Sequence, residues 1–259
     1  MQPNALKAKL AAGSTVFGTY VAIPSPAVVE TLALAGLDFV RMDPYHVAFN
    51  RETLENMVRA AYAHGITPWA RIRNDPWEIA TTLDTGVQIV TLPNIGTAEE
   101  ARSAAAAARY PPYGERENGR PLRFKAMDEA EYLRWAEREI MVACQIEGTQ
   151  GLENYREIVK VEGVAIVQTG RGDLANALGF PGEIFHPRVL EIEAEIVEAA
   201  RAAGKEVSLH VPLSERGFEH ARVWIARGVR IFTLDIDVNV LLRTYRDGLV
   251  DLRRSAGLA

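Results

Sequence analysis

The sequence has almost no cysteine, no excess of basic residues and no long apolar run. Its single cysteine, Cys144, excludes an intramolecular disulfide and a cysteine-rich metal site. The formal net charge of −5 provides no basic field that would attract nucleic acid or anionic lipid. No stretch approaches the roughly 20 apolar residues of a membrane span, and residues 1–10 lack the apolar core of a signal peptide. We therefore expect a cytoplasmic protein without nucleic-acid or membrane partners.

Short β-rich runs alternate along the chain with longer helical patterns. Several of the runs are almost continuously apolar, as parallel strands covered on both faces should be. Helix starts are marked as well: Ser25 and Asp75 each precede a proline, and Thr97 with Glu100 is typical of a capping box. The eight runs are Thr15–Ile23, Asp38–Asp43, Thr67–Ile72, Val87–Leu92, Met141–Glu147, Val164–Thr169, Glu206–Val211 and Ile231–Asp237.

Eight strands, each followed by a helix or a loop, predict a (β/α)₈ barrel that spans residues 1–259 as a single domain. A Rossmann-like sheet is the main alternative, but it would place a G-x-G-x-x-G turn after an early strand, and the sequence has none there. One long irregular stretch, Tyr110–Arg123, is rich in proline, glycine and arginine. We interpret it as an active-site loop.

Two carboxylates follow neighbouring strands of the predicted barrel, where the chemistry of such barrels is found. Glu147 comes directly after the fifth run, and Asp173 follows the sixth. A pair of carboxylates with open positions for water and substrate suits Mg²⁺ or Mn²⁺. The alternative is that each carboxylate caps a helix or pairs with an arginine.

Two further side chains at strand ends are candidates for catalysis. His46 lies in the loop after the second run and could act as a general acid and base, with Asp43 orienting its ring. A lone loop histidine is otherwise a surface residue. Arg71 ends the buried third strand, and a buried arginine needs an anion, either a carboxylate side chain or a substrate.

These residues lie in segments that together resemble the HpcH/HpaI aldolase/citrate lyase family, the class II pyruvate aldolases, from about residue 5 to residue 245. The order and spacing of the segments carry the resemblance. They are Leu37-Asp38-Phe39-Val40 continuing to Asp43-Pro44-Tyr45-His46, then Arg71, Leu83-Asp84-Thr85-Gly86, Arg109-Tyr110-Pro111-Pro112-Tyr113-Gly114, Gln145-Ile146-Glu147 and Gly170-Arg171-Gly172-Asp173-Leu174.

The resemblance implies a barrel whose last helix is exchanged between subunits of a homo-oligomer, usually a hexamer. It implies Mg²⁺, Mn²⁺ or a similar ion such as Co²⁺, held by Glu147 and Asp173. The substrate would be a small 2-oxo acid, with pyruvate chelated through its carboxylate and ketone oxygens.

The resemblance also assigns roles to other side chains. Arg71 would face the 2-oxo oxygen as it becomes an enolate. His46 would manage protons, supported by Asp43 and by the Asp84 of a neighbouring subunit. Gln145 would orient water or substrate at the metal.

The sequence departs from the family pattern near two of these sites. Tyr45 replaces the usual glutamate before His46, and Arg171 and Gly172 replace the proline and alanine of Gly-Pro-Ala-Asp-Leu. Backbone N–H groups between Gly170 and Gly172 could hold the substrate carboxylate. An inward Arg171 side chain would add a partner for a second carboxylate, whereas an outward one would only pair with a surface acid.

The leading interpretation is a metal-dependent carbon–carbon lyase. It would reversibly cleave a 4-hydroxy-2-oxo acid into pyruvate and an aldehyde through a metal-bound enolate. The alternative is an oxaloacetate-using relative, either a decarboxylase or a citrate-synthase-like condensing enzyme. A third interpretation is a metal-binding paralogue with little catalytic activity.

Overall fold

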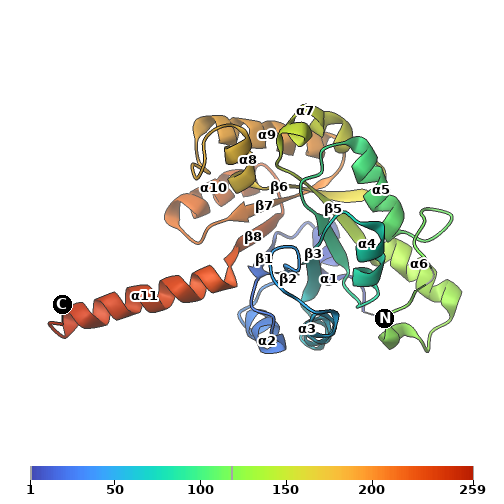
Figure 1. Cartoon of the computed structure of the whole chain (residues 1–259), viewed down its shortest axis with the longest axis horizontal. Coiled ribbons are helices and arrows are strands. Elements are labelled where there is room, and N and C mark those ends of the chain that lie inside the picture. The colour runs from blue at the N-terminus through green and yellow to red at the C-terminus, as the bar shows by residue number, and fades with distance from the viewer. Residues whose placement is uncertain (1, 118, 259) are drawn as a thin grey trace.

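A closed barrel of eight parallel strands forms the centre of the computed structural model, which describes residues 2–117 and 119–258 (Figure 1). Each strand pairs with the next along the chain, and β8 closes the barrel against β1. Every strand end lies within two residues of a predicted boundary, so the predicted (β/α)₈ barrel is confirmed. The strands are β1 (Val16–Val21), β2 (Phe39–Met42), β3 (Thr67–Arg71), β4 (Ile89–Leu92), β5 (Met141–Ile146), β6 (Val164–Thr169), β7 (Glu206–Val211) and β8 (Ile231–Ile236).

Helices follow the strands and begin largely where the sequence predicts. The Thr97 hydroxyl accepts from the Glu100 backbone N–H at 3.1 Å, and the Glu100 carboxylate accepts from the Thr97 N–H at 3.2 Å. Asp75 also caps its helix, whereas the Ser25 side chain makes no capping bond. The helices are α1 (Ala5–Ala11), α2 (Pro26–Leu34), α3 (Arg51–Ala63), α4 (Pro76–Leu83), α5 (Ala98–Ala108), the short 3₁₀ helix η1 (Leu122–Phe124), α6 (Glu129–Glu139), α7 (Thr149–Ile158), α8 (Arg171–Ala177), α9 (Pro187–Ala202), α10 (Glu215–Ala226) and α11 (Asp237–Ser255).

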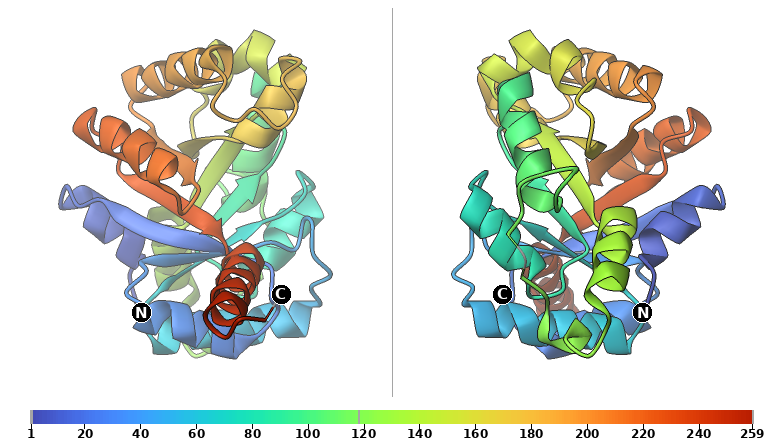
Figure 2. Two further views of the ribbon diagram at one scale, coloured as in Figure 1. Left: turned by 90° about the vertical axis from the view of Figure 1, so that its left-hand side faces the viewer. Right: turned by 90° about the vertical axis from the view of Figure 1, so that its right-hand side faces the viewer.

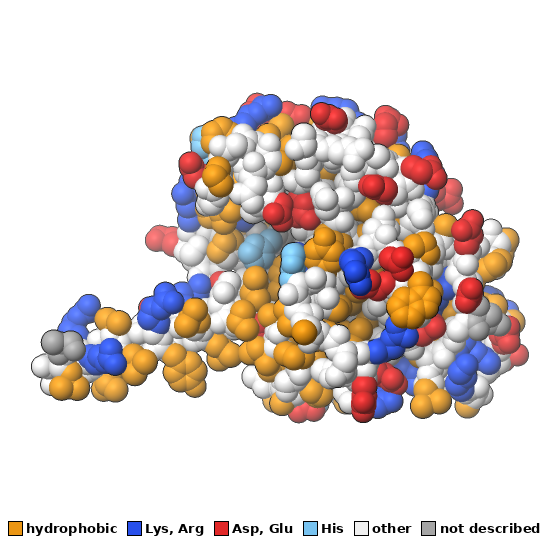
Figure 3. Space-filling view, in the orientation of Figure 1, with side chains coloured by type: hydrophobic (Ala, Val, Ile, Leu, Met, Phe, Trp, Pro, Cys, Tyr) orange, Lys and Arg blue, Asp and Glu red, His pale blue; other side chains and the backbone are white. Residues whose placement is uncertain are grey.

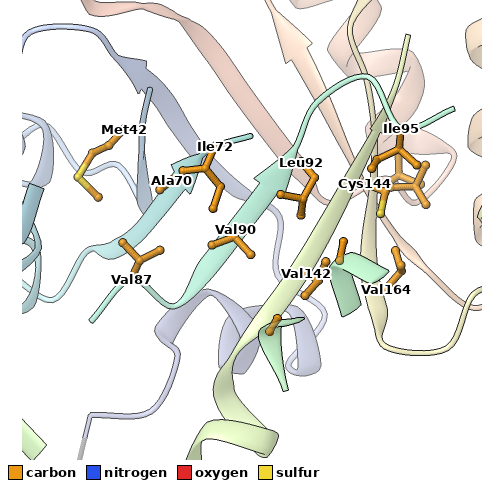
Figure 4. Packing of buried hydrophobic residues seen from close by; sticks show 14 of the residues in the cluster. Met42, Ala70, Ile72, Val87, Val90, Leu92, Ile95, Val142, Cys144 and Val164 are labelled. Carbon is orange, nitrogen blue, oxygen red and sulfur yellow. The ribbon is translucent and has the colours of Figure 1, made fainter. Parts of the chain in front are cut away.

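Strand residues alternate between the barrel interior and the layer between strands and helices. The outward-facing residues, such as Val90 and Leu92, pack in the main hydrophobic core with the buried Cys144 (Figure 4). An apolar layer fills the N-terminal end of the interior, where Leu6 and Leu10 of α1 pack against it. It is made of Val16, Phe39, Trp69, Ile89, Met141, Ala143, Ile166 and Ile231. The other end of the interior therefore receives the polar side chains of the strand ends.

The C-terminal helix α11 extends away from the barrel instead of packing on it (Figures 1 and 2). Apolar side chains lie exposed along it and are visible as an orange row on its lower side in Figure 3. They include Leu241, Leu242, Tyr245, Leu249, Val250 and Leu252. Within residues 2–117 and 119–258, neither this helix nor any other is long and apolar enough to cross a membrane.

The irregular segment Tyr110–Arg123 does not border the mouth of its own barrel, so its interpretation as an active-site loop is wrong within one chain. It follows α5, which runs back from the C-terminal end of β4, and therefore lies near the N-terminal ends of the strands. Its buried Arg116 side chain donates to Asp84 at 2.7 Å. Loops that follow helices in this fold face away from the catalytic end.

Candidate active site

The C-terminal ends of β2, β3, β5 and β6 bring polar side chains to one end of the barrel interior. Asp43 and Arg71 come from the first two of these strands, and Gln145 and Glu147 from β5. The strand period of two turns these odd-numbered residues inward, while their even-numbered neighbours face the helices. The barrel thus gathers candidate residues that are more than 100 positions apart in the sequence.

Arg71 forms a bidentate ion pair with Asp43. Its Nε donates to Asp43 Oδ1 at 2.9 Å, and its Nη2 donates to Oδ2 at 2.6 Å. Burial acts to lower the pKa of Arg71, but the hydrogen bonds to Asp43 and the charge interactions with Tyr20, Asp43 and Glu147 together outweigh it, so the pKa is raised. The Arg71 guanidinium also lies 4.7 Å from the centre of the Tyr20 ring. Arg71 is therefore a fixed cation whose partner in this structure is a carboxylate side chain.

Glu147 is a buried carboxylate held on both oxygens. Its Oε1 accepts from the backbone N–H of Asn94 at 3.1 Å, and its Oε2 accepts from the Gln145 amide. Burial and, to a smaller extent, the nearby Asp173 raise the pKa of Glu147 to about 7, whereas Arg71 opposes the shift. A buried carboxylate with a second carboxylate nearby is suited to bind a cation, because the cation offsets the cost of charging it.

The turn between β6 and α8 packs tightly against Glu147. A Cβ atom added to Gly170 would lie 1.8 Å from Glu147 Oε2 and 2.6 Å from Gln145 Nε2, so only glycine fits there. Gly172 has no such constraint, because a Cβ atom there would meet nothing within 4 Å. Asp173 lies in the first turn of α8, where backbone N–H groups have no partner within the helix. The predicted backbone cradle for a carboxylate thus coincides with the start of a helix.

The Arg171 side chain points away from Glu147, which corrects the expectation that it turns toward the substrate. It is 2% exposed, its Nη2 donates to the carbonyl oxygen of His210 at 2.5 Å, and its Nε lies 3.4 Å from Glu193 Oε1. Glu193 is itself fully buried and also lies 2.9 Å from His220 Nε2. The partner is therefore a buried acid on α9, neither a substrate nor a surface residue.

These residues fit a divalent cation. Glu147 and Asp173 supply two hard oxygen donors, and Gly170 allows the backbone to lie close to Glu147. The Gln145 side-chain oxygen is buried and has no hydrogen-bond partner in the part of the chain that the structure describes. No group of three or more potential ligands among His, Cys, Asp and Glu occurs in that part of the chain. A cation here would thus rely on two carboxylates, with water and substrate completing its coordination.

The other two predicted residues do not join this cluster. His46 lies in the loop after β2, where its ring packs edge-on against Tyr45 with a centroid distance of 4.7 Å. Both oxygens of Asp43 accept from Arg71, and no hydrogen bond joins Asp43 to the His46 ring within residues 2–117 and 119–258. Asp84 follows α4 at the opposite end of the barrel and pairs with Arg116. A single chain therefore does not bring Asp84 to His46.

Sequence reasoning missed several residues of the barrel mouth. Asn94 holds Glu147 through a left-handed backbone with φ of 52°, which its Pro-Asn sequence could have indicated. His210 is half-buried at the end of β7, and desolvation together with Arg171 lowers its pKa to about 4. Tyr20 and Arg41 face the barrel interior on the N-terminal side of Arg71. The single arginine in the otherwise apolar β2 could have indicated that Arg41 has a special role.

Comparison with known proteins gives the family and the fold relatives of this chain. A sequence model of the HpcH/HpaI aldolase/citrate lyase family matches residues 16–240. The hydroxypyruvate/pyruvate aldolase of Delftia acidovorans is 32% identical over 92% of this chain and 88% of that protein. The crystal structure of an HpcH/HpaI aldolase from Desulfitobacterium hafniense has a TM-score of 0.90 and 30% identity over 96% of both chains. That of the citrate synthase SbnG has a TM-score of 0.89 and 30% identity over 98% of this chain and 99% of that one. The chain belongs to the HpcH/HpaI aldolase/citrate lyase family.

Proposed function

We propose that the protein is a divalent-metal-dependent aldolase that reversibly cleaves a 4-hydroxy-2-oxo acid to pyruvate and an aldehyde. The observation that carries the proposal is the buried Glu147, paired with Asp173 on one side and facing the fixed cation Arg71 on the other. The Delftia relative, whose name is hydroxypyruvate/pyruvate aldolase, supports this reaction. Arg71 and a divalent ion held by the two acids would together suit a substrate that gains negative charge as its bond breaks.

Glu147 and Asp173 are the residues that would hold the ion, either Mg²⁺ or Mn²⁺, with Co²⁺ as a further candidate. A divalent cation bound there supplies Lewis-acid charge that polarises the 2-oxo group. Arg71 stabilises the oxyanion that develops on that group, since its guanidinium is charged at any working pH. Asp43 fixes the direction of Arg71 through two hydrogen bonds, so no reorganisation is needed when charge develops.

Proton transfer and substrate orientation fall to other residues. Gln145 donates its amide N–H to Glu147, which leaves its side-chain oxygen free to accept from water or from a substrate hydroxyl. The backbone N–H groups of the first turn of α8 would bind the substrate carboxylate. His46 would exchange a proton with the substrate, since a positioned imidazole can both take and give a proton near neutral pH.

A homo-oligomer, most simply a hexamer, would complete this site. The exposed apolar side chains of α11 need a partner, and a neighbouring subunit that receives this helix would bury them. Asp84 lies too far along its own barrel to support its own His46. An Asp84 that reaches the His46 of a neighbour would bring both residues into one active site.

The alternative is an enzyme that uses oxaloacetate. The 30% identity to the citrate synthase SbnG favours it, because that protein shares the whole barrel with this chain. The sequence argument from Arg171 no longer favours it, because this side chain is bound to Glu193 and His210. We therefore place aldol cleavage first.

A product panel tests the proposal against its alternatives. Protein stripped of metal and reloaded with Mg²⁺ or Mn²⁺ is incubated with pyruvate and a set of aldehydes, with oxaloacetate, and with oxaloacetate and acetyl-CoA. The metal-ligand variant Glu147→Gln serves as the control. Metal-dependent 4-hydroxy-2-oxo acid formation supports the aldolase. Turnover of oxaloacetate alone favours the alternative, and metal binding without any product favours the inactive paralogue.

A further inference from the structure

A buried cation without a carboxylate partner lies below the candidate active site. Arg41 on β2 is 0% exposed and faces the barrel interior. Its Nη1 donates to the Tyr20 hydroxyl at 3.1 Å, its Nη2 donates to Ser208 Oγ at 3.0 Å, and its guanidinium lies 3.9 Å from the Trp69 ring centre. No ion pair joins Arg41 to an acid within residues 2–117 and 119–258. A fully buried arginine of this kind is rare, because burying an unpaired charge is costly.

Tyr20 connects this cation to the mouth of the barrel. Its ring lies 5.0 Å from the Arg41 guanidinium and 4.7 Å from that of Arg71. Its hydroxyl accepts a second hydrogen bond from Gln168 Nε2 at 2.8 Å, so the ring is held from below by two donors. Two cations thus contact one aromatic ring, although only Arg71 has a carboxylate.

The charges of the mouth leave Arg41 unmatched. Asp43 neutralises Arg71, and a divalent cation would match the two carboxylates Glu147 and Asp173. Among these five side chains, the remaining positive charge is that of Arg41. Asp237 after β8 is a further buried carboxylate, which the backbone N–H groups of Ala22, Ile23 and Val238 hold. The group of five is neutral only when it holds an anion besides the divalent cation, and a 2-oxo acid brings one.

We propose that Arg41 supplies the uncompensated positive charge that matches the bound 2-oxo acid, and that it thereby favours doubly charged over singly charged ligands at this site. This inference rests on the proposed function, because the anion in question is the substrate of that reaction. Arg41 acts without touching the ligand, since Tyr20 separates it from the mouth. The enolate formed from pyruvate carries one more negative charge than pyruvate, so the same charge that aids binding aids the reaction.

Opposite changes in metal and anion affinity test the proposal. In Arg41→Met, loss of a nearby positive charge tightens Mn²⁺ binding and weakens oxalate binding to the Mn²⁺-loaded protein. Oxalate resembles the pyruvate enolate in charge and size. Each change is expected to be about 100-fold, because Mn²⁺ and oxalate each carry two charges and a unit charge about 10 Å away, at an effective dielectric constant of about 20, contributes about 10-fold per ligand charge. Free Mn²⁺ is followed by electron paramagnetic resonance, and oxalate binding by calorimetry. A variant that weakens both ligands equally, or neither, contradicts the proposal.

Three comparisons keep the test independent of folding. The ratio of oxalate to oxamate affinity is measured in one preparation, so an unfolded fraction cancels; it falls about 10-fold in Arg41→Met, because oxamate carries one charge. Arg41→Lys keeps the charge and holds this ratio within about 3-fold of the wild type. Thr233→Val changes a buried side chain of the barrel interior without changing its charge, and leaves the ratio unaltered. A ratio that falls equally in Arg41→Lys or Thr233→Val overturns the inference.

The wild type separates this inference from the proposed function. Oxalate binding that does not depend on a divalent cation contradicts the proposed function, whatever the variants do. Cation-dependent oxalate binding in the wild type, with an unchanged oxalate-to-oxamate ratio in Arg41→Met, contradicts the inference alone.

Discussion

Arg71 ends β3 and Arg171 begins α8 after β6, at the same end of one barrel, yet their surroundings differ. Arg71 pairs with Asp43 and keeps 13% of its side chain exposed toward the mouth. Arg171 is 2% exposed and is enclosed by Glu193, the His210 carbonyl and the ring of Phe185. The first arginine is open to a ligand, and the second joins α8 to β7 and α9. Closeness in sequence to a candidate metal ligand therefore does not make a side chain part of the binding site.

The largest expected effect comes from removing a carboxylate at the barrel mouth, where Arg71 is open to a ligand. Glu147→Gln removes one of two charged donors from a hard-cation site, so Mn²⁺ affinity should fall by at least about 1,000-fold and turnover should be lost. Titration of free Mn²⁺ measures the affinity. The control is Glu195→Gln on α9, whose carboxylate accepts from Tyr155 outside the barrel. Equal effects of the two substitutions would contradict the assignment of Glu147.

Arg71→Lys directly tests the arginine that is open to a ligand. Lysine retains the charge but cannot make two parallel hydrogen bonds to Asp43, so the cation no longer has a fixed direction. Pyruvate enolisation should slow by about 100- to 1,000-fold, as for the loss of a preorganised oxyanion donor, while Mn²⁺ affinity changes little. Solvent deuterium exchange of the pyruvate methyl group measures the rate. A near-normal rate would show that Arg71 is structural.

Arg171→Met tests the enclosed arginine. It leaves Glu193 buried without its arginine, which should lower the free energy of unfolding by about 3–5 kcal/mol. The loosened first turn of α8 carries Asp173, so Mn²⁺ affinity should fall by about 10- to 100-fold. Denaturant unfolding and Mn²⁺ titration measure the two effects. The double variant Arg171→Met with Glu193→Leu removes both charges and should recover most of the stability. A selective loss of dicarboxylic substrates in Arg171→Met would instead restore its role in substrate binding.

The smallest expected effect is the pH dependence that Glu147 gives to Mn²⁺ affinity and to stability. The pKa of Glu147 is raised to about 7, and a cation binds its charged form, so Mn²⁺ affinity should fall by about 5-fold from pH 7 to pH 6 and level off above pH 7. In the metal-free protein the pH dependence concerns the free energy of unfolding, which falls as the pH rises. A raised acid pKa contributes stability below the ordinary value of 4.5, and on the order of 3 kcal/mol is lost as the pH rises to 7. Glu147→Gln should remove both slopes, and slopes that persist would assign them to another group.

The barrel and its polar end were predictable from the sequence, because buried parallel strands are continuous apolar runs and their ends hold the functional side chains. Glu147 and Arg71 were found in this way. The direction of Arg171 could not be predicted, because it depends on a buried acid 22 residues later that packs against it only in the folded chain. The position of Tyr110–Arg123 was predictable in principle, since a segment that follows a helix returns to the N-terminal ends of the strands.

Deuterium exchange of the pyruvate methyl group in D₂O tests the central claim most directly, because it needs the cation site, Arg71 and a proton-exchanging group such as His46, but no aldehyde. The account predicts rapid exchange with Mg²⁺ or Mn²⁺, no exchange after exhaustive chelation, and recovery when the metal is returned. Exchange that survives chelation, or that never occurs with either metal, would contradict it.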